Sequence, residues 1–357
     1  MQGITEDAVV WAYKLLLDRE PESEHAIRNK CEALETLRDL RLDIINSDEY
    51  RSRNKQAQAP ASGQSPFFHY AATFDAIGVM YHHAVASLEE KPGYLVNFLG
   101  VVIDPKFFPA ILQDRSGRVE GVPIPANWHA DIAEWGAALR AVDLSGKRFV
   151  IAELGCGWGC WMNNAGVAAR SSGREVKVIG IEGDGDHLQF AREALAANGF
   201  DDTQIELHRG IATFQSGVAL FPRQEIPGSS WGSEPIFNAT DEQRQKAIHT
   251  GHYDEVPMMP LAEVIASEHR IDLLHIDIQG GEADLVEQNL ALLNQKVAYL
   301  LIGTHSKQIE GRLYAMLLDA GWHLEMERPA LFDIVGGQPR IRVDGVQGWR
   351  NITLLPE

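Results

Sequence analysis

The sequence has few of the features that mark secreted, membrane-spanning or nucleic-acid-binding proteins. Its 357 residues include only three cysteines, too few for a disulfide framework and wrongly spaced for a four-cysteine zinc site. No run approaches the ~20 apolar residues that cross a bilayer. The start, MQGITEDAVV, lacks the basic region and apolar stretch of a secretory signal. We therefore expect a cytoplasmic protein with no transmembrane segment.

Basic side chains are also scarce. Lysine and arginine number 32 against 50 aspartates and glutamates, for a net charge of −18. Such an excess of negative charge repels phosphate backbones and anionic lipid surfaces, so we expect no general affinity for nucleic acid or membranes. Apolar residues make up 45% of the chain, which is ordinary for a globular protein, and the length suggests about two domains.

The texture of the sequence changes along the chain and predicts several regions. Residues 1–56 alternate apolar and charged side chains in a helical pattern and form a predicted accessory domain, and residues 57–66, AQAPASGQSP, suit a linker. Residues 67–146 form a mixed, partly helical lead-in. Strands and helices then alternate over residues 147–357, with a long insertion at 213–260 that is typical of a lid.

The alternation of strands and helices predicts the fold class. Residues 148–154, RFVIAEL, form a continuous apolar run, as expected of a strand buried on both faces. Four further strands are predicted at residues 176–182, 204–210, 271–278 and 296–303. Strands separated by helices form a mainly parallel sheet covered on both faces, so we predict an α/β, Rossmann-like fold. Ligands bind such sheets at the carboxyl ends of the strands.

The first predicted strand runs into a glycine-rich turn, ELGCGWG, at residues 153–159. Glycines at alternate positions let a ligand approach the backbone, and the helix start that follows can bind an anion. A plain glycine-rich turn would have the same composition. A dinucleotide site would show G-x-G-x-x-G, whereas the spacing here is G-x-G-x-G. The candidate ligand-binding residues of this turn are Glu153, Gly155, Cys156, Gly157 and Trp158.

The next two strands end in further candidates. Glu182 closes the second strand, where an acid can accept both hydroxyl protons of a ribose. Gly183 and Asp184 follow it, although acids at such positions often only cap the next helix. The third strand ends in residues placed to hold an adenine edge, although an ordinary loop would look the same. These residues are Arg209, Gly210 and Ile211.

The fourth strand ends in Asp277, which faces the same cleft as the glycine-rich turn. Glu282 follows in the first turn of a helix, where the helix dipole favours an anion. Glu282 is therefore either part of the site or simply a helix-start acid.

Together, ELGCGWG, the acid of GIEGD and DLLHIDIQGGE resemble the FkbM family of S-adenosylmethionine-dependent methyltransferases. The family's D-x-x-G-x-E hallmark is matched by Asp277, Gly280 and Glu282, while Gln279 stands where an acid is usual. The resemblance covers roughly residues 147–355, with a longer segment between the third and fourth strands than is common.

This resemblance implies a seven-stranded class I methyltransferase sheet with one antiparallel strand. It also implies methyl transfer from S-adenosylmethionine to a hydroxyl, frequently of a saccharide or glycoconjugate. The turn at Gly155–Trp158 would hold the methionine part of the cofactor, and Glu182 the ribose. The N-terminal YKLLLDREPES and NSDEYRSR are similar to a small helical domain of unassigned function found beside glycan-modifying enzymes. Partner docking, membrane-proximal glycan assembly and homo-oligomerisation all fit this region.

A sugar hydroxyl benefits from a general base or a metal ion. His305, after the fifth strand, is the candidate base, because that strand should lie beside the fourth and bring His305 towards Asp277. The alternative is a solvated histidine at a helix start. A divalent ion such as magnesium could instead be held by Asp277 and His305, with Glu282 or a group of the cofactor as a further ligand. We leave this alternative open and assign no metal ligand.

Two residues are candidates for contact with the acceptor. Trp231, in the insertion, offers an aromatic face for a sugar ring, or else anchors its own loop. Glu282 is the second candidate. Two other functions compete with methyl transfer: a nucleotide-cofactor oxidoreductase on a related sheet, and a catalytically inactive glycan-binding scaffold.

Overall fold

The computed structural model describes residues 4–17, 19–34, 36–45, 47, 49 and 65–356, and the chain divides into two compact units, residues 1–68 and 69–357. All but the last two residues of the predicted linker, 57–66, lie outside the described residues.

The first unit is helical and has an apolar core of its own. Its helices are α1 (Glu6–Leu17), α2 (Glu24–Ala33) and α3 (Leu37–Ile45). The core is formed by Ile4, Val9, Tyr13, Leu17, Leu40 and Ile44. These side chains recur at helical spacing along α1 and α3, so each helix turns one stripe towards the other.

The second unit is built on one large sheet with the strand order β1-β13-β16-β12-β11-β5-β6-β7. Its strands are β5 (Arg148–Leu154), β6 (Glu175–Glu182), β7 (Ile205–Arg209), β11 (Leu273–Ile276), β12 (Tyr299–Thr304), β13 (His323–Arg328), β16 (Gly345–Arg350) and β1 (Ala71–Ala72). β16 is antiparallel to both of its neighbours, β12 and β13. The predicted seven-stranded sheet with one antiparallel strand is therefore confirmed, with β1 as an added antiparallel edge strand beside β13.

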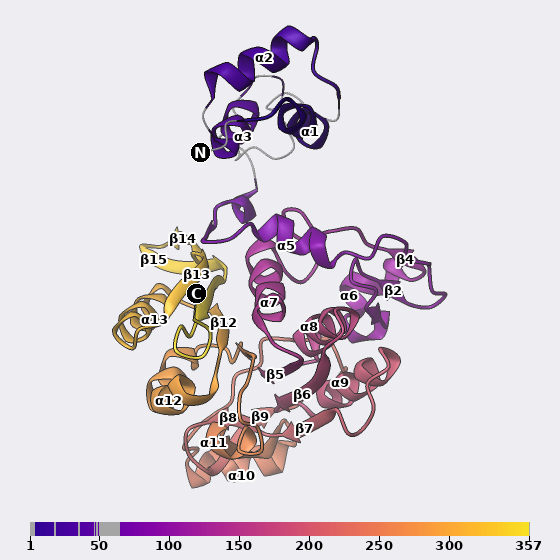
Figure 1. Ribbon diagram of the computed structural model, residues 1–357. Helices are drawn as coiled ribbons and strands as arrows, with labels where there is room; N and C mark the ends of the chain where they lie inside the picture. The colour runs from indigo at the N-terminus through magenta and orange to yellow at the C-terminus, as the bar shows by residue number, and fades with distance from the viewer. Residues whose placement is uncertain are drawn as a thin grey trace. The chain divides into compact units, whose positions relative to one another are not determined.

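Helices cover both faces of this sheet (Figure 1). α7 (Ile132–Leu144), α8 (Cys160–Ser171) and α9 (Gly185–Ala197) pack in series on one face, and α12 (Glu282–Lys296) and α13 (Lys307–Asp319) pair on the other. α5 (Ala76–His83) packs on α7. The central strands β5, β11 and β12 are mostly apolar, because both of their faces are buried.

Smaller elements extend the unit. The insertion forms a second sheet, in which β10 (Tyr253–Pro260) lies between β8 (Ile211–Thr213) and β9 (Gly217–Pro222), and it carries α10 (Asp241–Thr250). A hairpin of β14 (Leu331–Val335) and β15 (Gln338–Val343) joins β13 to β16. The remaining elements are η1 (Pro66–Phe68), β2 (Leu95–Val96), β3 (Val102–Ile103), η2 (Pro105–Phe107), α6 (Pro109–Leu112), η3 (Gln113–Arg115), β4 (Arg118–Val119) and α11 (Leu261–Val264).

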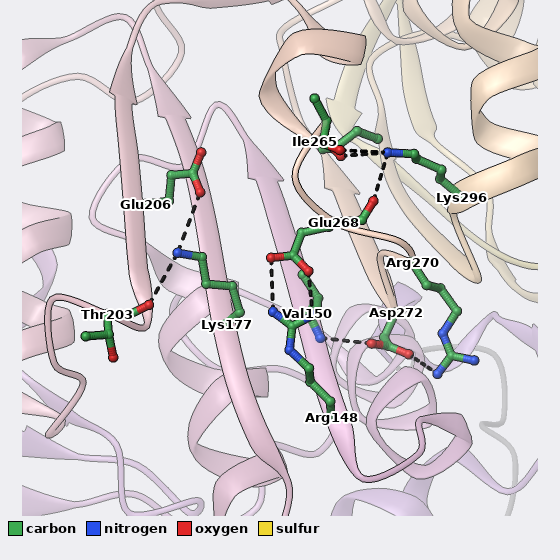
Figure 2. A network of polar contacts seen from close by, with 11 residues as sticks. Arg148, Val150, Lys177, Thr203, Glu206, Ile265, Glu268, Arg270, Asp272 and Lys296 are labelled. Atoms are coloured by element: carbon green, nitrogen blue, oxygen red, sulfur yellow. Dashed lines mark hydrogen bonds and ion pairs between the residues drawn. The ribbon is translucent and has the colours of Figure 1, made fainter.

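The amino ends of the central strands are tied together by a polar network (Figure 2). Arg148, at the start of β5, pairs with Glu268, and the carboxylate of Asp272 accepts the backbone N–H of Val150 at 2.9 Å. Lys177 on β6 lies 3.6 Å from the carboxylate of Glu206 on β7. These bonds join strands at the end of the sheet opposite to their carboxyl ends.

Among the described residues, no helix combines the length and the apolar character that crossing a bilayer would require.

Candidate active site

A cavity of about 380 Å³ lies at the carboxyl ends of β5, β6 and β11. This is the edge at which α/β sheets of this kind bind ligands. The predicted residues that line it are Gly155, Gly157, Glu182, Gly183, Gly210, Ile211, Trp231 and Asp277. The sequence therefore located the cavity, while the ligand contacts of these residues stay predictions.

The glycine-rich turn needs its glycines. Gly155 and Gly157 have φ of 72° and 53°, in the left-handed region that other residues rarely adopt. A Cβ at Gly155 would lie 2.2 Å from the backbone oxygen of Asp277, and one at Gly157 would lie 2.5 Å from Cζ3 of Trp231. The backbone of the turn thus packs against the end of β11 on one side and against the insertion on the other.

Glu182 links the end of β6 to this turn. Its Oε2 accepts the backbone N–H of Gly157 and its Oε1 that of Asp184, both at 2.8 Å. Burial raises the pKa of Glu182 to about 7, against the lowering effect of those hydrogen bonds. A carboxylate has further lone pairs beyond these two bonds, so Glu182 can still accept hydroxyl protons from a ligand in the cavity.

Glu153 has a different place from the one predicted. Its side chain is 2% exposed, and its oxygens accept the backbone N–H groups of Trp161 at 3.1 Å and Met162 at 2.9 Å. Glu153 thus occupies the start of α8, where the sequence suggested a ligand anion, and it does not line the cavity. Burial raises its pKa to about 8. The prediction that it binds the cofactor is wrong in this structure.

Four other predicted cofactor residues also lie away from the cavity wall. Cys156 and Trp158 are buried, and the Trp158 ring stacks on Phe107 at 5.8 Å between centroids. Asp184 caps α9 by accepting two backbone N–H groups, and Arg209 pairs with Asp254. Asp184 and Arg209 border a separate hollow that shares Gly183 with the cavity.

Asp277 and His305 come together as predicted, because β11 and β12 are parallel neighbours. Nε2 of His305 lies 3.3 Å from Oδ1 of Asp277, and its Nδ1 lies 2.9 Å from Oε1 of Glu282. The Asp277 side chain is 41% exposed and lines the cavity. Gln279 donates from Nε2 to the same Asp277 oxygen at 3.1 Å.

The charges around His305 set its protonation. Burial lowers the pKa of His305, but the hydrogen bonds and charges of Asp277 and Glu282 outweigh it and raise the pKa to about 10. Burial raises the pKa of Asp277, and the His305 partner more than offsets this, so the pKa of Asp277 lies below its usual value. The predicted base is therefore in the expected place but holds a proton at neutral pH; its role stays a prediction.

Glu282 does not face an acceptor. Its side chain is fully buried, and Oε1 accepts the backbone N–H groups of Ile278 at 3.2 Å and Gly280 at 3.0 Å in addition to its contact with His305. Gly280 has φ of 105°, which only glycine adopts readily. The prediction of acceptor contact is therefore wrong: Glu282 holds the loop between Asp277 and α12, which explains the D-x-x-G-x-E spacing.

Trp231 anchors its loop. Its ring stacks on His187 with centroids 4.0 Å apart and on Phe108 at 5.1 Å, and its Nε1 donates to the backbone oxygen of Gly228 at 3.2 Å. Protein rings already stack on the indole, which favours the loop-anchor alternative, but Trp231 also lines the cavity, so its contact with an acceptor stays a prediction. The insertion nevertheless supplies much of the cavity wall; whether it moves as a lid stays a prediction.

Sequence reasoning missed several residues of this region. Phe221 and Phe237 of the insertion and His187 of α9 line the cavity. Burial and the charge of Asp131 raise the pKa of Glu134 on α7 to about 8, and the charge of Asp277 adds a smaller increase. No local motif marks these residues, because each reaches the site through tertiary packing.

The cavity suits a nucleoside-containing ligand. Ile181, Ile211 and Phe221 give it an apolar part, and Glu182 provides a hydroxyl acceptor beside the open backbone of the turn. A Rossmann-like sheet with an inserted antiparallel β16, a glycine-rich turn after β5 and an acid at the end of β6 defines a class I methyltransferase, a fold that generally uses S-adenosylmethionine.

Comparisons with known proteins agree with this class. Residues 149–320 match the profile described as "Methyltransferase FkbM domain". A protein of Jannaschia sp. (strain CCS1) described as "Putative methyltransferase" is 46% identical over 273 residues, covering 76% of this chain and 96% of its own. The chain therefore belongs to the FkbM methyltransferase family.

Solved structures of methyltransferases are also similar. The FkbM methyltransferase of Methylobacillus flagellatus KT has a TM-score of 0.37 and 14% identity, over 61% of this chain and 54% of its own. Precorrin-6y C5,15-methyltransferase of Geobacter metallireducens GS-15 has a TM-score of 0.33 and 8% identity, over 60% of this chain and 86% of its own.

Proposed function

We propose that this methyltransferase is S-adenosylmethionine-dependent and transfers the methyl group to a hydroxyl of a saccharide or glycoconjugate. The observation that carries the proposal is the Asp277–His305 pair, 3.3 Å apart, of which Asp277 lines the cavity beside the glycine-rich turn. A hydroxyl must lose its proton as it is methylated, and the Asp277 carboxylate, held by the protonated His305 ring, can accept the hydrogen bond of that hydroxyl and take up its proton.

The charge of the cavity supports this cofactor. Its lining includes Glu182, Glu234, Asp277 and Asp284, and among the described lining residues there is no lysine or arginine. An acidic wall attracts a sulfonium cation and favours release of the neutral thioether product. The same charge disfavours phosphorylated acceptors and agrees with a neutral, hydroxyl-rich one.

S-adenosylmethionine supplies an already activated methyl group, so the protein mainly has to align the reacting atoms. Glu182 would accept the ribose hydroxyls, and the open backbone at Gly155 and Gly157 would face the rest of the cofactor. Asp277, with its exposed oxygen, would bind the acceptor hydroxyl. We further propose that the protein acts in the cytoplasm, and that its N-terminal unit docks it to a partner or a second copy.

The first experiment is calorimetric titration of the full chain with S-adenosylmethionine, S-adenosylhomocysteine and NAD. Micromolar binding of the first two without NAD is expected, followed by transfer of labelled methyl to one member of a sugar panel. Binding of NAD alone would favour the oxidoreductase. Binding of no nucleotide would favour the scaffold. Cofactor binding with transfer only to amine or carbon acceptors would overturn the O-methyl assignment.

A further inference from the structure

The acidic end of the active site has the composition of a cation site. Asp277, Glu282 and His305 each offer one potential ligand atom, and these atoms all lie within 4.8 Å of one another. The three residues come from the ends of β11 and β12 and the start of α12, so their backbones are fixed by the central sheet.

Hydrogen-bond accounting shows what lies between Asp277 and His305. A carboxylate only accepts, so the 2.9 Å contact with Glu282 requires a proton on Nδ1 of His305. In a neutral ring, Nε2 is then an acceptor that faces another acceptor, Oδ1 of Asp277, at 3.3 Å. Something positive must bridge these two atoms, either a second proton or a cation.

The charge of the cluster favours the cation. Among the described residues, His305 is the one cationic side chain that pairs with Asp277 or Glu282. Two carboxylates and an imidazolium still carry one net negative charge, whereas two carboxylates, a neutral imidazole and a divalent ion carry none. The full burial of Glu282 makes that uncompensated charge costly.

Glu282 supplies a second, independent observation. Its side chain is fully buried, and its Oε2 has no hydrogen-bond partner in the described part of the chain. Metal-binding histidines commonly donate their other ring N–H to a carboxylate, which fixes the tautomer and the ring orientation. Glu282 stands in that relation to His305, which is the one side chain among the described residues that pairs with its carboxylate beside the backbone N–H groups of Ile278 and Gly280.

The spacing also fits. Two ligands bound to one cation at ~2.0–2.2 Å, in tetrahedral or octahedral arrangement, lie roughly 2.9–3.5 Å apart. The separation of 3.3 Å between Nε2 of His305 and Oδ1 of Asp277 falls within this span. One carboxylate and one imidazole suit Mn²⁺ better than Mg²⁺, and both metals accept water or hydroxyl oxygens at the remaining positions.

We propose that Asp277 and His305 bind a divalent cation of the Mn²⁺ class, with Glu282 as the buried carboxylate that orients His305. Asp277 lines the cavity, so a hydroxyl in the cavity could bind the cation and would then lose its proton more readily. That catalytic role rests on the proposed function, whereas the binding site does not.

The test measures binding of Mn²⁺ to the full chain, after chelator treatment, by electron paramagnetic resonance of the free ion. We expect one site that weakens at least tenfold in Asp277→Asn and in His305→Gln, and less in Glu282→Gln, whose amide oxygen can still accept from His305. S-adenosylhomocysteine binding and thermal melting show whether each variant is folded. If one of Asp277→Asn and His305→Gln does not fold, the other is enough to test the site.

A second cluster provides the matched control. His82, His83 and Asp143, where α5 and α7 end, also bring three potential ligand atoms within 4.8 Å. His83→Gln should leave the active-site binding unchanged. Absence of Mn²⁺ binding at millimolar metal, or binding that His83→Gln abolishes and Asp277→Asn preserves, would overturn the inference.

Methyl transfer is then measured separately with chelated and Mn²⁺-loaded protein. Specific Mn²⁺ binding without transfer to any hydroxyl would overturn the proposed function and leave the cation site in place. Equal transfer by both forms, without specific Mn²⁺ binding, would overturn the cation site and leave the proposed function in place.

Discussion

Glu182, at the end of β6, accepts the backbone N–H of Gly157 at 2.8 Å and so fixes the turn that follows β5. The residue proposed to bind the ribose is therefore also the one that shapes the backbone facing the rest of the cofactor. One buried carboxylate therefore both binds the ribose, in the proposed function, and fixes the turn beside it, so Glu182 is the first residue to substitute.

Glu182→Ala should weaken S-adenosylhomocysteine binding by roughly 1.5–3 kcal/mol, the scale of hydrogen bonds to a charged group. Isothermal calorimetry gives the value. Glu175→Gln, an exposed position at the other end of β6, is the control and should bind like the wild type. Unchanged affinity in Glu182→Ala would remove the residue from the site.

The pH dependence of binding follows from the same residue. Burial raises the pKa of Glu182 from 4.5 to about 7 in the folded protein. Its carboxylate form accepts hydroxyl protons, so cofactor affinity should fall below about pH 7, by at most about tenfold per pH unit. Calorimetry between pH 5.5 and 8.5 measures the slope, and Glu182→Gln should flatten it.

The contribution of Glu182 to folding stability changes with pH in the opposite direction to its contribution to cofactor affinity. The folded protein holds this proton more tightly than the unfolded chain, so the free energy of unfolding contributed by Glu182 decreases as pH rises from about 4.5 to about 7. Urea unfolding gives the free energy of unfolding of the wild type and of Glu182→Gln at each pH, and the difference between the two isolates the contribution. A difference that grows with pH in this window would contradict the raised pKa.

Gly157→Ala should weaken both folding and cofactor binding. The left-handed φ of 53° costs an L residue roughly 1–2 kcal/mol, and the new Cβ would lie 2.5 Å from Cζ3 of Trp231. We expect at least a tenfold loss of S-adenosylhomocysteine affinity because the anchored tryptophan must shift. Gly146→Ala, where a Cβ meets nothing within 4 Å, is the matched control.

Glu282→Ala should lower the free energy of unfolding by about 2–4 kcal/mol, because it leaves the N–H groups of Ile278 and Gly280 and a ring N–H of His305 without their acceptor. Glu287→Ala, on the exposed side of the same helix, should stay within roughly 0.5 kcal/mol. Urea unfolding compares the two. Equal effects would mean that the loop does not depend on Glu282.

His305→Gln should lower turnover by roughly 10²–10⁴-fold while leaving the dissociation constant of the cofactor within about twofold. The separation is expected because His305 contacts Asp277 and Glu282 and is not among the residues that line the cavity. Single-turnover rates and calorimetry measure the two quantities, and His323→Gln, on an exposed strand end, is the control. Wild-type turnover in His305→Gln would exclude it from the reaction.

The sequence was sufficient for features that repeat or that the backbone imposes. Buried apolar runs separated by helices predicted the sheet, and neighbouring strands brought Asp277 and His305 together. The left-handed turn at Gly155 and Gly157 follows from glycine itself.

The sequence did not predict the contacts of side chains that could bind either of two partners. Glu153 satisfies the start of its own α8 instead of a ligand, and Trp231 stacks on His187 and Phe108, which are distant in sequence. Glu282 lies beneath its loop because that loop folds back over the carboxylate. Such choices depend on packing and desolvation, which composition and spacing do not encode.

The insertion between β8 and β10 has a sheet and a small apolar cluster of its own, formed by Ile211, Ala219, Phe221 and Val256, while it also lines the cavity. Folding of the central sheet is secured at the other end of the strands by the ion pairs around Arg148 and Asp272. Because the insertion has a sheet and an apolar cluster of its own, substitutions inside it should reshape the cavity wall without unfolding the central sheet that carries the glycine-rich turn and Glu182.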